Sequence, residues 1–364
     1  MNNALNWMRG LSTALALTAS LTLAGTAVLA MSHGGGPSGD PAFLPEGATL
    51  ETLVDGEAND LIFAEGPVVT CDGRVLWSDI TFSSAPNAPN GELRAGNIME
   101  YDPRTKKVSV FRSPSGMSNG LRIDLDCNLL AAEGADYGGR RLTRTDMKTG
   151  RATIVTALYD GRPYNALNDI AIDSKARIYF SDPRYLGWEP VYQPGFAVYR
   201  VDTDHSVHRI ITDAGKTNGV AICPDEKHIF VVSNDNGGLE FQSPPLEEGQ
   251  GFYKGPMHLA MYDLDRDGNA SNRQIIVDYY PEDGPDGLVC DADGDLWVAV
   301  RDAKRPGIYA YSVENGKAVE KAYIPTTIPT NVHFGRGSDI SYLYITAGNS
   351  LFGIQTNKKG HHLQ

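Results

Sequence analysis

Six polar residues recur along this chain, each at the head of a short run that leads into apolar strands. These residues, called the heads from here on, are Glu65, Asn119, Asn168, Asn218, Asp286 and Asn331. Their spacings are 54, 49, 50, 68 and 45 residues. A repeat of this period is typical of propellers and similar arrays, in which each unit packs against its neighbours. The sequence therefore predicts a closed ring of six units, with one head from each unit near the axis.

Each repeat has the pattern of four antiparallel strands. A short apolar strand follows the head, and an Asp- and Gly-rich turn such as residues 71–74 leads to a continuous apolar run such as residues 229–232. A third strand and a more polar fourth strand complete the unit, which is the composition of a propeller blade. No stretch shows a sustained helical period. We predict an all-β protein, a six-bladed β-propeller of four-stranded antiparallel blades, over residues 48–356.

The last repeat stops before its outer strand, and residues 49–54 form a strand-like segment before the first repeat. We expect this N-terminal strand to complete the last blade, because pairing the first and last units leaves no free edge at the seam. The insertion from Asn236 to Pro256 is rich in Gly, Pro and Glu. It is expected to be a surface loop or lid rather than a new domain.

The two ends of the chain differ from the repeats in composition. Residues 1–30 contain an apolar stretch and a small-residue cleavage site before Met31, which is the pattern of a secretory signal peptide. The alternative is an uncleaved anchor. Residues 31–47 are expected to be a flexible segment and residues 357–364 a polar tail. The predicted location is therefore exported, either periplasmic or secreted, with no membrane attachment after signal cleavage.

The formal net charge of −13 argues against nucleic acid and anionic membranes as partners and favours cations or small molecules. We expect a monomer or a weak homo-oligomer. The four cysteines, Cys71, Cys127, Cys223 and Cys290, lie in four different repeats and form no CxxC pair. Two disulfides are one reading and buried free thiols are the other, so the sequence leaves the disulfide state open.

Six oxygen-bearing heads around one axis predict a metal site. Two carboxylates and four carboxamides, with no Cys or His, suit a hard cation. Ca²⁺ is the first choice, with Zn²⁺, Mn²⁺ or Mg²⁺ as alternatives. Single pairs such as Asn119-Gly120 are also turn formers, but a turn requirement does not explain Glu65 and Asn168 at the same place. The acidic segments 263–268 and 291–295 imitate calcium loops and are expected to be hairpin turns.

At these residues the sequence resembles the gluconolactonase, regucalcin and senescence-marker-protein family of six-bladed propellers. The resemblance spans residues 48–356. It rests on Glu65-Gly66-Pro67, on residues 165–169 and 180–185, on Asn218-Gly219-Val220 with Pro224-Asp225, and on Pro285-Asp286-Gly287. Any one of these motifs alone is weak, and together they are specific.

The resemblance implies one catalytic divalent ion, held by Glu65, Asn168, Asn218 and Asp286. Asn119 and Asn331 would then lie on the inner rim without a bond to the metal. They are expected to contact substrate, together with Asn165 and His333, for which a packed core histidine is the alternative. The sequence departs from the family at one place that matters: regucalcin-like members carry a substrate-contacting Arg two residues before Asn168, and this chain has Ala166.

The activity that the resemblance implies is hydrolysis of a lactone or related ester, such as a sugar lactone. The ion would polarise the carbonyl group, and Asp286 would be the general base. Two alternatives stay open at this point. One is an organophosphate or aryl-ester hydrolase that uses the same site, and the other is a non-catalytic calcium-binding propeller. No Gly-x-Ser-x-Gly nucleophile motif is present.

Overall fold

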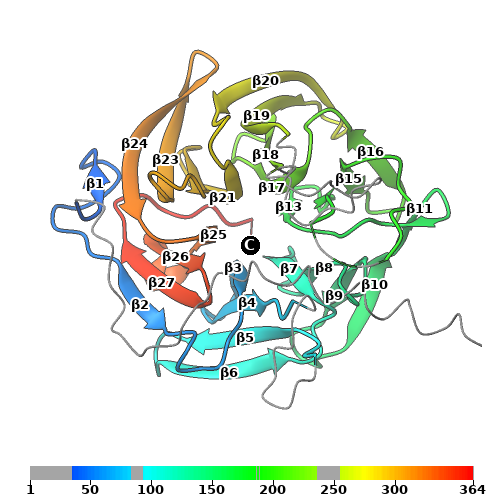
Figure 1. The fold of residues 1–364 in the computed structure, drawn as a ribbon, viewed down its shortest axis with the longest axis horizontal. Coiled ribbons are helices and arrows are strands. Elements are labelled where there is room, and N and C mark those ends of the chain that lie inside the picture. The colour runs from blue at the N-terminus through cyan, green and yellow to red at the C-terminus, as the bar shows by residue number, and fades with distance from the viewer. Residues whose placement is uncertain (1–34, 83–92, 186, 188, 236–254, 364) are drawn as a thin grey trace, which may run out of the picture. The chain divides into compact units, whose positions relative to one another are not determined.

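The computed structural model describes residues 35–82, 93–185, 187, 189–235 and 255–363. In this part of the chain, six four-stranded antiparallel blades surround a central axis (Figure 1). The predicted six-bladed propeller is therefore confirmed. The predicted signal peptide, residues 1–30, lies outside the described residues. Most of the 236–256 insertion, residues 236–254, lies outside them as well.

The blades follow one another around the ring in chain order, and each begins at the axis and ends at the rim. From the inside outwards, blade 1 consists of β3 (Ala64–Val69), β4 (Val75–Asp79), β5 (Asn97–Asp102) and β6 (Lys107–Arg112). Blade 2 consists of β7 (Ser118–Ile123), β8 (Leu129–Glu133), β9 (Arg141–Thr145) and β10 (Ala152–Thr156). Blade 3 consists of β13 (Ile170–Ile172), β14 (Ile178–Asp182), β15 (Ala197–Val201) and β16 (Val207–Ile211). A small hairpin, β11 (Leu158–Tyr159) and β12 (Arg162–Pro163), precedes blade 3.

The other three blades have the same order. Blade 4 consists of β17 (Thr217–Ile222), β18 (His228–Asn234), β19 (Met257–Leu264) and β20 (Ala270–Asp278). Blade 5 consists of β21 (Pro285–Cys290), β22 (Leu296–Val300), β23 (Gly307–Glu314) and β24 (Lys317–Pro325). Blade 6 consists of β25 (Pro329–Phe334), β26 (Tyr342–Ala347), β27 (Ser350–Gln355) and β2 (Glu51–Val54). One short 3₁₀ helix, η1 (Gly337–Asp339), lies between β25 and β26. In the described residues no helix is long and apolar enough to cross a membrane.

The hydrophobic core lies between neighbouring blades. The second strands β4, β8, β14 and β22 are buried at every position, as their continuous apolar runs predict. Trp297 of β22 and Phe334 of β25 meet edge to face across blades 5 and 6, with ring centroids 5.6 Å apart. The outer strand β6, by contrast, has no buried residue. Each blade is thus covered on both faces and solvated at its rim.

The ring closes as the sequence predicts. Strand β2 pairs antiparallel with β27, with Glu51 opposite Gly353 and Thr52 opposite Phe352. The N-terminal strand is therefore the outermost strand of the last blade. This pairing joins two segments that are about 300 residues apart in the chain and leaves no open edge between the first and last blades.

The segments that flank the propeller are held to it more closely than their composition predicts. Strand β1 (Ser38–Gly39) pairs with β24, and the next apolar residues, Phe43 and Leu44, enter the core beside Trp297. The expectation of a flexible segment over residues 31–47 therefore does not describe residues 38–44, because two buried side chains fix them. The polar tail is also bound: the amide of Asn357 donates to Phe43 O, and that of Gly360 donates to Ile340 O.

Both cysteine pairs are joined as disulfides. Cys71 bonds to Cys127 between blades 1 and 2, and Cys223 bonds to Cys290 between blades 4 and 5. Cys71 and Cys127 lie in the turns after the innermost strands β3 and β7, Cys223 directly follows β17, and Cys290 is the last residue of β21. The sequence leaves the disulfide state of the four cysteines open, and the structure shows two disulfides.

The two calcium-loop imitations are hairpin turns, as expected. Asp265, between β19 and β20, accepts hydrogen bonds from the amides of Asp267 and Asn269. Asp291, between β21 and β22, accepts from the amides of Asp293 and Asp295 in the same way. Lys358 neutralises the second turn through contacts with Asp293 and Asp295. These carboxylates therefore stabilise the hairpin turns in which they lie.

Candidate metal centre and its pocket

The heads lie at the starts of the innermost strands. Five of them are the second or third residue of β3, β7, β17, β21 and β25, and Asn168 lies two residues before β13. In those five strands the pairing with the second strand breaks register next to the head, for example between Glu65 and Val68 or between Thr217 and Val220. Such bulges change the direction of a side chain without ending the strand. These five heads therefore belong to bulged strands rather than to simple entry turns, and Asn168 lies outside its strand.

The glycines that follow the heads are explained by crowding at the axis. A side chain on Gly120 would approach Asn168 O to 2.6 Å, and one on Gly219 would approach Asp286 O to 2.5 Å. Gly66 and Gly287 meet Asn119 and Asn331 in the same manner. Four heads, Asn119, Asn168, Asp286 and Asn331, thus pack against the glycine of the preceding blade. The head–glycine pairs bring successive blades into direct contact around the axis.

Two carboxylates are buried together among these heads. Glu65 is 4% exposed and Asp286 is 3% exposed. Burial raises the pKa of Asp286 to about 6, although the positive charge of Arg301 opposes the shift. Burial also raises the pKa of Glu65 well above its ordinary value, and the negative charge of Asp286 raises it further. The negative charge of each acid makes ionisation of the other less favourable, and a bound cation would offset this repulsion.

The carboxamide heads surround this pair. Asn218 donates a hydrogen bond to Asp286, and its amide nitrogen also donates to the hydroxyl of Tyr185 at 3.2 Å. Tyr185 is held in turn by Asn234 O, to which its hydroxyl donates at 2.9 Å. Asn168 and Asn119 line the adjoining pocket. The structure thus brings Asn218 to the two acids and places Asn168 and Asn119 at the pocket beside the axis.

Asn331 is engaged within the protein. Its side-chain oxygen accepts a hydrogen bond from the amide of Val332 at 2.8 Å, and its side chain also bonds Asp169. Asp169 is a buried acid beside Asn168 that sequence analysis missed. It accepts from the amides of Ile170 and Val220. The Asn168-Asp169 pair was visible in the sequence, but only the fold shows that the second residue ties three blades together.

Arg301 is the other missed residue. It directly follows β22, and its Nη1 lies 3.2 Å from Asp286 Oδ2. It is partly exposed, whereas Asp286 is buried. The register that places Pro285 opposite Val300 brings this Arg next to a head 15 residues earlier in the chain. No sequence motif at Arg301 predicts its contact with Asp286, because that contact depends on the register of the hairpin β21–β22.

A pocket of about 60 Å³ adjoins the heads. Asn119, Asn168 and Tyr185 line the part nearest the axis, and the remaining lining residues are Ile80, Met117, Gly134, Ala135, Asp136, Ala166 and Leu167. Asn165 is not among the lining residues. Its side chain is fully buried, and its amide nitrogen donates to the carbonyl oxygens of Asp182 and Gly195. The prediction that Asn165 contacts substrate therefore finds no support in its position.

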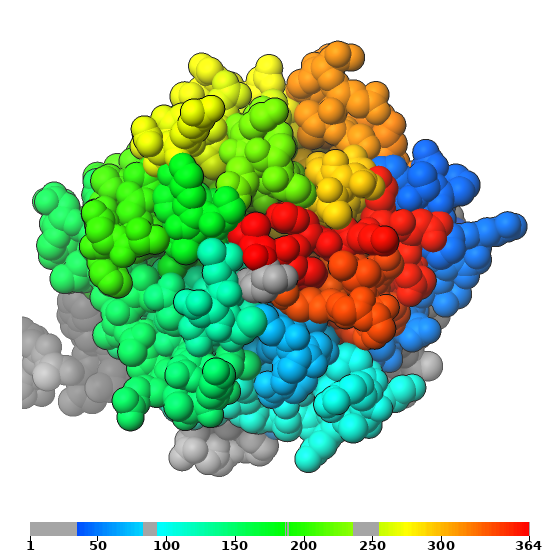
Figure 2. All heavy atoms as spheres, turned by 180° about the vertical axis from the view of Figure 1, so that it is seen from behind, coloured from blue at the N-terminus to red at the C-terminus, as the bar shows by residue number. Residues whose placement is uncertain are grey.

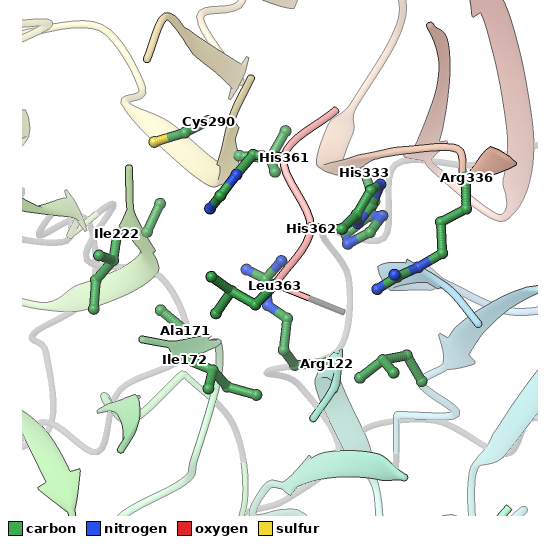
Figure 3. Close-up of a pocket in the computed structure, with 13 residues that line it drawn as sticks. Arg122, Ala171, Ile172, Ile222, Cys290, His333, Arg336, His361, His362 and Leu363 are labelled. Carbon is green, nitrogen blue, oxygen red and sulfur yellow. The ribbon is translucent and has the colours of Figure 1, made fainter. Parts of the chain in front are cut away.

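His333 lies in a different cavity. This cavity, called the far pocket from here on, lies at the other ends of the innermost strands and also contains Arg122, Arg336, His361 and His362 (Figure 3). The Nδ1 of His333 donates a hydrogen bond to Phe334 O, and its ring packs against the ring of His362. Seen from behind, the red C-terminal tail covers the centre of the ring (Figure 2). The structure therefore does not bring His333 to the heads.

The residues at the axis fit a hard divalent ion. The two acids are buried within electrostatic reach of each other, of a third acid, Asp169, and of Arg301, and Asn218 bonds Asp286. The described heads include no soft thiolate or imidazole donor. Carboxylate and amide oxygens are the donor set that Ca²⁺ prefers, with a flexible coordination number. The four predicted ligands, Glu65, Asn168, Asn218 and Asp286, belong to four different blades.

Comparison with known proteins points in one direction. A family model described as "SMP-30/Gluconolactonase/LRE-like region" matches residues 63–239 and 255–349. A gluconolactonase of Zymomonas mobilis is 25% identical over 375 residues, covering 95% of this chain and 94% of that protein. The regucalcin of Gallus gallus is 24% identical, covering 72% of this chain and 82% of that protein.

Solved structures share the fold. A gluconolactonase from Xanthomonas campestris has a TM-score of 0.69 at 23% identity, covering 88% of this chain and 95% of that one. A regucalcin from Agrobacterium tumefaciens, described as a calcium-binding protein, has a TM-score of 0.62 at 18% identity, covering 85% and 95%. At these identities the likeness establishes the propeller and not the chemistry.

Proposed function

Because this chain belongs to the SMP-30/Gluconolactonase/LRE-like family, we propose that it is a divalent-metal-dependent hydrolase that opens a lactone or a related carboxylic ester. The observation that carries the proposal is the pair of buried acids, Glu65 and Asp286, among amide side chains at one end of the central channel. Relatives named gluconolactonase and pentonolactonase support the reaction class.

Glu65, Asn168, Asn218 and Asp286 would hold the ion, with Ca²⁺ as the first candidate. When bound, such an ion supplies Lewis-acid stabilisation for negative charge on a carbonyl oxygen and favours ionisation of water. Glu65 acts as a ligand. Tyr185 positions Asn218, because its hydroxyl donates a hydrogen bond to Asn234 O and accepts one from the side-chain amide of Asn218. The ring of Tyr185 packs under the amine of Lys216, 4.5 Å from the ring centroid.

Asp286 is the proposed general base. As water adds to the carbonyl carbon of the lactone, a carboxylate oxygen of Asp286 takes its proton. The ring C–O bond then breaks, and the leaving alkoxide receives that proton, so that the product is a hydroxy acid. Arg301 donates to Asp286 Oδ2 and favours the ionised carboxylate that this role requires. It also fixes the orientation of that carboxylate.

Export is part of the proposal. The apolar stretch within residues 1–30 has the pattern of a signal peptide, and the two disulfides are the kind of bond that persists in oxidising compartments. The acidic net charge of −13 fits a small-molecule substrate and no nucleic-acid partner.

Chelation and metal return test this function. Purified protein is treated with EDTA, dialysed and assayed on a panel of lactones, aryl esters and organophosphates, before and after addition of Ca²⁺, Zn²⁺, Mn²⁺ or Mg²⁺. We expect lactone hydrolysis to be lost on chelation and restored by one or more of these ions. Full lactone hydrolysis by metal-free protein would contradict the mechanism. Tight metal binding without turnover of any substrate would indicate a binding propeller instead.

A further inference from the structure

The wall of the pocket beside the heads is mostly apolar. Ile80 follows β4 of blade 1, Met117 and Ala135 flank the two inner strands of blade 2, and Ala166 and Leu167 precede β13 of blade 3. Four of these side chains are less than 9% exposed in the structure, and Ala166 is half-buried. Three successive blades therefore present aliphatic groups to one cavity.

Four polar residues, Asn119, Asp136, Asn168 and Tyr185, line this pocket, and two of them are heads. The hydroxyl of Tyr185 is already bonded to Asn234 O and Asn218. Among the described residues that line the pocket, Asp136 is the one charged side chain. A lactone that bears a hydroxyl on each ring carbon would place several of these hydroxyls against Ile80, Met117 or Leu167. There they would lose water without gaining a partner, which is unfavourable.

The wall is also fixed in place. The carbonyl of Met117 accepts a hydrogen bond from the amide of Gly134 at 2.9 Å, and its sulfur lies 3.8 Å from the hydroxyl of Thr81. The amide of Ala166 is held by Asp182 Oδ1 at 2.8 Å. A pocket whose wall is already ordered selects ligands by shape and polarity without first rearranging.

We propose that the preferred substrate is a lactone with a short aliphatic substituent rather than a polyhydroxylated sugar lactone. The ring carbonyl would lie at the heads, and the substituent would fill the cavity between blades 1 and 3. This inference rests on the proposed function, since it takes the reacting carbonyl to lie at Glu65 and Asp286. It narrows the substrate class, and it separates this chain from relatives that are named for sugar lactones.

The first test compares lactones of one ring size with the metal-loaded protein. For δ-lactones that bear hydrogen, methyl, ethyl or propyl, kcat/KM should rise about fourfold per methylene until the cavity is full. The propyl lactone should exceed glucono-δ-lactone by at least tenfold. A preference for glucono-δ-lactone, or no dependence on the alkyl chain, would overturn the inference while leaving the lactonase function intact.

Variants of the wall give a second test. Met117→Gln adds a polar group at nearly constant size and should lower kcat/KM for the propyl lactone about tenfold, with little loss for glucono-δ-lactone. Met147→Gln, the same change in the turn between β9 and β10, is the matched control and should stay within about threefold on both substrates. Ala166→Asn repeats the test at a half-buried position where folding is less at risk, and thermal melting checks all three proteins. Equal losses on both substrates would contradict the assignment of this wall to substrate.

Binding distinguishes this inference from the proposed function. A cyclic ketone with a propyl group resembles the lactone but cannot be hydrolysed, and its affinity can be measured by calorimetry with metal-loaded protein. Tighter binding of this ketone than of a hydroxylated analogue, weakened by Met117→Gln, would support the pocket even if no lactone were turned over. Failure of both ketones to bind would overturn it.

Discussion

The two ends of the central channel are built from the same six strands and carry opposite chemistry. At the starts of these strands lie Glu65 and Asp286 with amide side chains. At their other ends, the far pocket holds Arg122, Arg336 and His333. The far-pocket residues on these strands follow the heads by only two to four residues, which is roughly 7–13 Å. The first residues of these strands thus lie among buried acids, and the last residues lie beside arginines.

The electrostatics of the far pocket follow from its burial. Burial lowers the pKa of His333 well below its ordinary value, and the charge of Arg122 lowers it further. Burial and Arg336 together lower the pKa of His362 to about 4, so both histidines are neutral near pH 7. The two arginines keep the pocket positive. A metal cation is therefore attracted to one end of the channel and repelled from the other, where the C-terminal tail covers the opening (Figure 2).

Removing one charge at the head end should have the largest effect. Asp286→Asn keeps the size of the side chain and removes both the ligand charge and the proposed base. We expect kcat/KM to fall by at least ~10³ and Ca²⁺ affinity to fall with it, measured by lactone hydrolysis and calorimetry. Asp293→Asn, in the exposed turn between β21 and β22, is the matched control and should change neither. An Asp286→Asn protein within tenfold of the parent would remove Asp286 from the site.

The pH dependence of metal binding sharpens the comparison. Since the pKa of Asp286 is raised to about 6, protons compete with the metal below that pH. Apparent Ca²⁺ affinity should fall by about tenfold per pH unit below 6, and more steeply if Glu65 also binds a proton. The histidines of the far pocket are neutral in this range, so they should add no further change in Ca²⁺ affinity between pH 6 and 8. Calorimetry across pH 4.5–8 measures this, and a flat profile would contradict the buried acid pair.

The same shift determines the stability of the metal-free protein. The folded-state pKa of Asp286 lies above its unfolded value near 4, so its stabilising contribution is complete below pH 4 and is lost as the pH rises through 6. Metal-free protein should therefore lose stability over this range, and Ca²⁺ should reverse the loss. Urea unfolding with and without Ca²⁺ at each pH provides the check.

Changes at the far end should affect stability with little effect on catalysis. Removal of residues 357–364 deletes the hydrogen bonds of Asn357 to Phe43 O, of Gly360 to Ile340 O and of His362 to Gly335 O. At about 1 kcal/mol per bond, unfolding free energy should fall by a few kcal/mol. Metal affinity and kcat/KM should stay within about threefold at a temperature where the protein is folded. A loss of metal binding in the folded, shortened chain would show that the two ends are coupled.

The sequence predicted the parts of the site that recur in each blade. The heads repeat at one structural position, and their chemical similarity is visible without coordinates. His333 shows where such reasoning stops. It lies only two residues after Asn331 and on the same side of its strand, yet two residues along β25 are enough to place it in the far pocket. Sequence proximity to a head does not give depth along the channel.

Contacts that depend on strand register or on the packing of neighbouring blades were beyond sequence reasoning. Arg301 reaches Asp286 through the register of β21 and β22, and the apolar wall is assembled from loops of three blades. Neither feature has a local pattern. The disulfides were undecided for the same reason: whether Cys71 meets Cys127 depends on the approach of neighbouring blades, which spacing alone does not fix.

Closure of the ring by β2 has a consequence for the order in which the protein can be completed during synthesis. Strand β2 leaves the ribosome among the first described residues, but its partner β27 follows about 300 residues later. Blades 1 to 5 can each form from contiguous chain, whereas blade 6 has to wait for residues 350–355. Until then the inner faces of blades 5 and 1 lack their neighbour. The closed ring of six heads can therefore exist only after nearly the whole chain has been made.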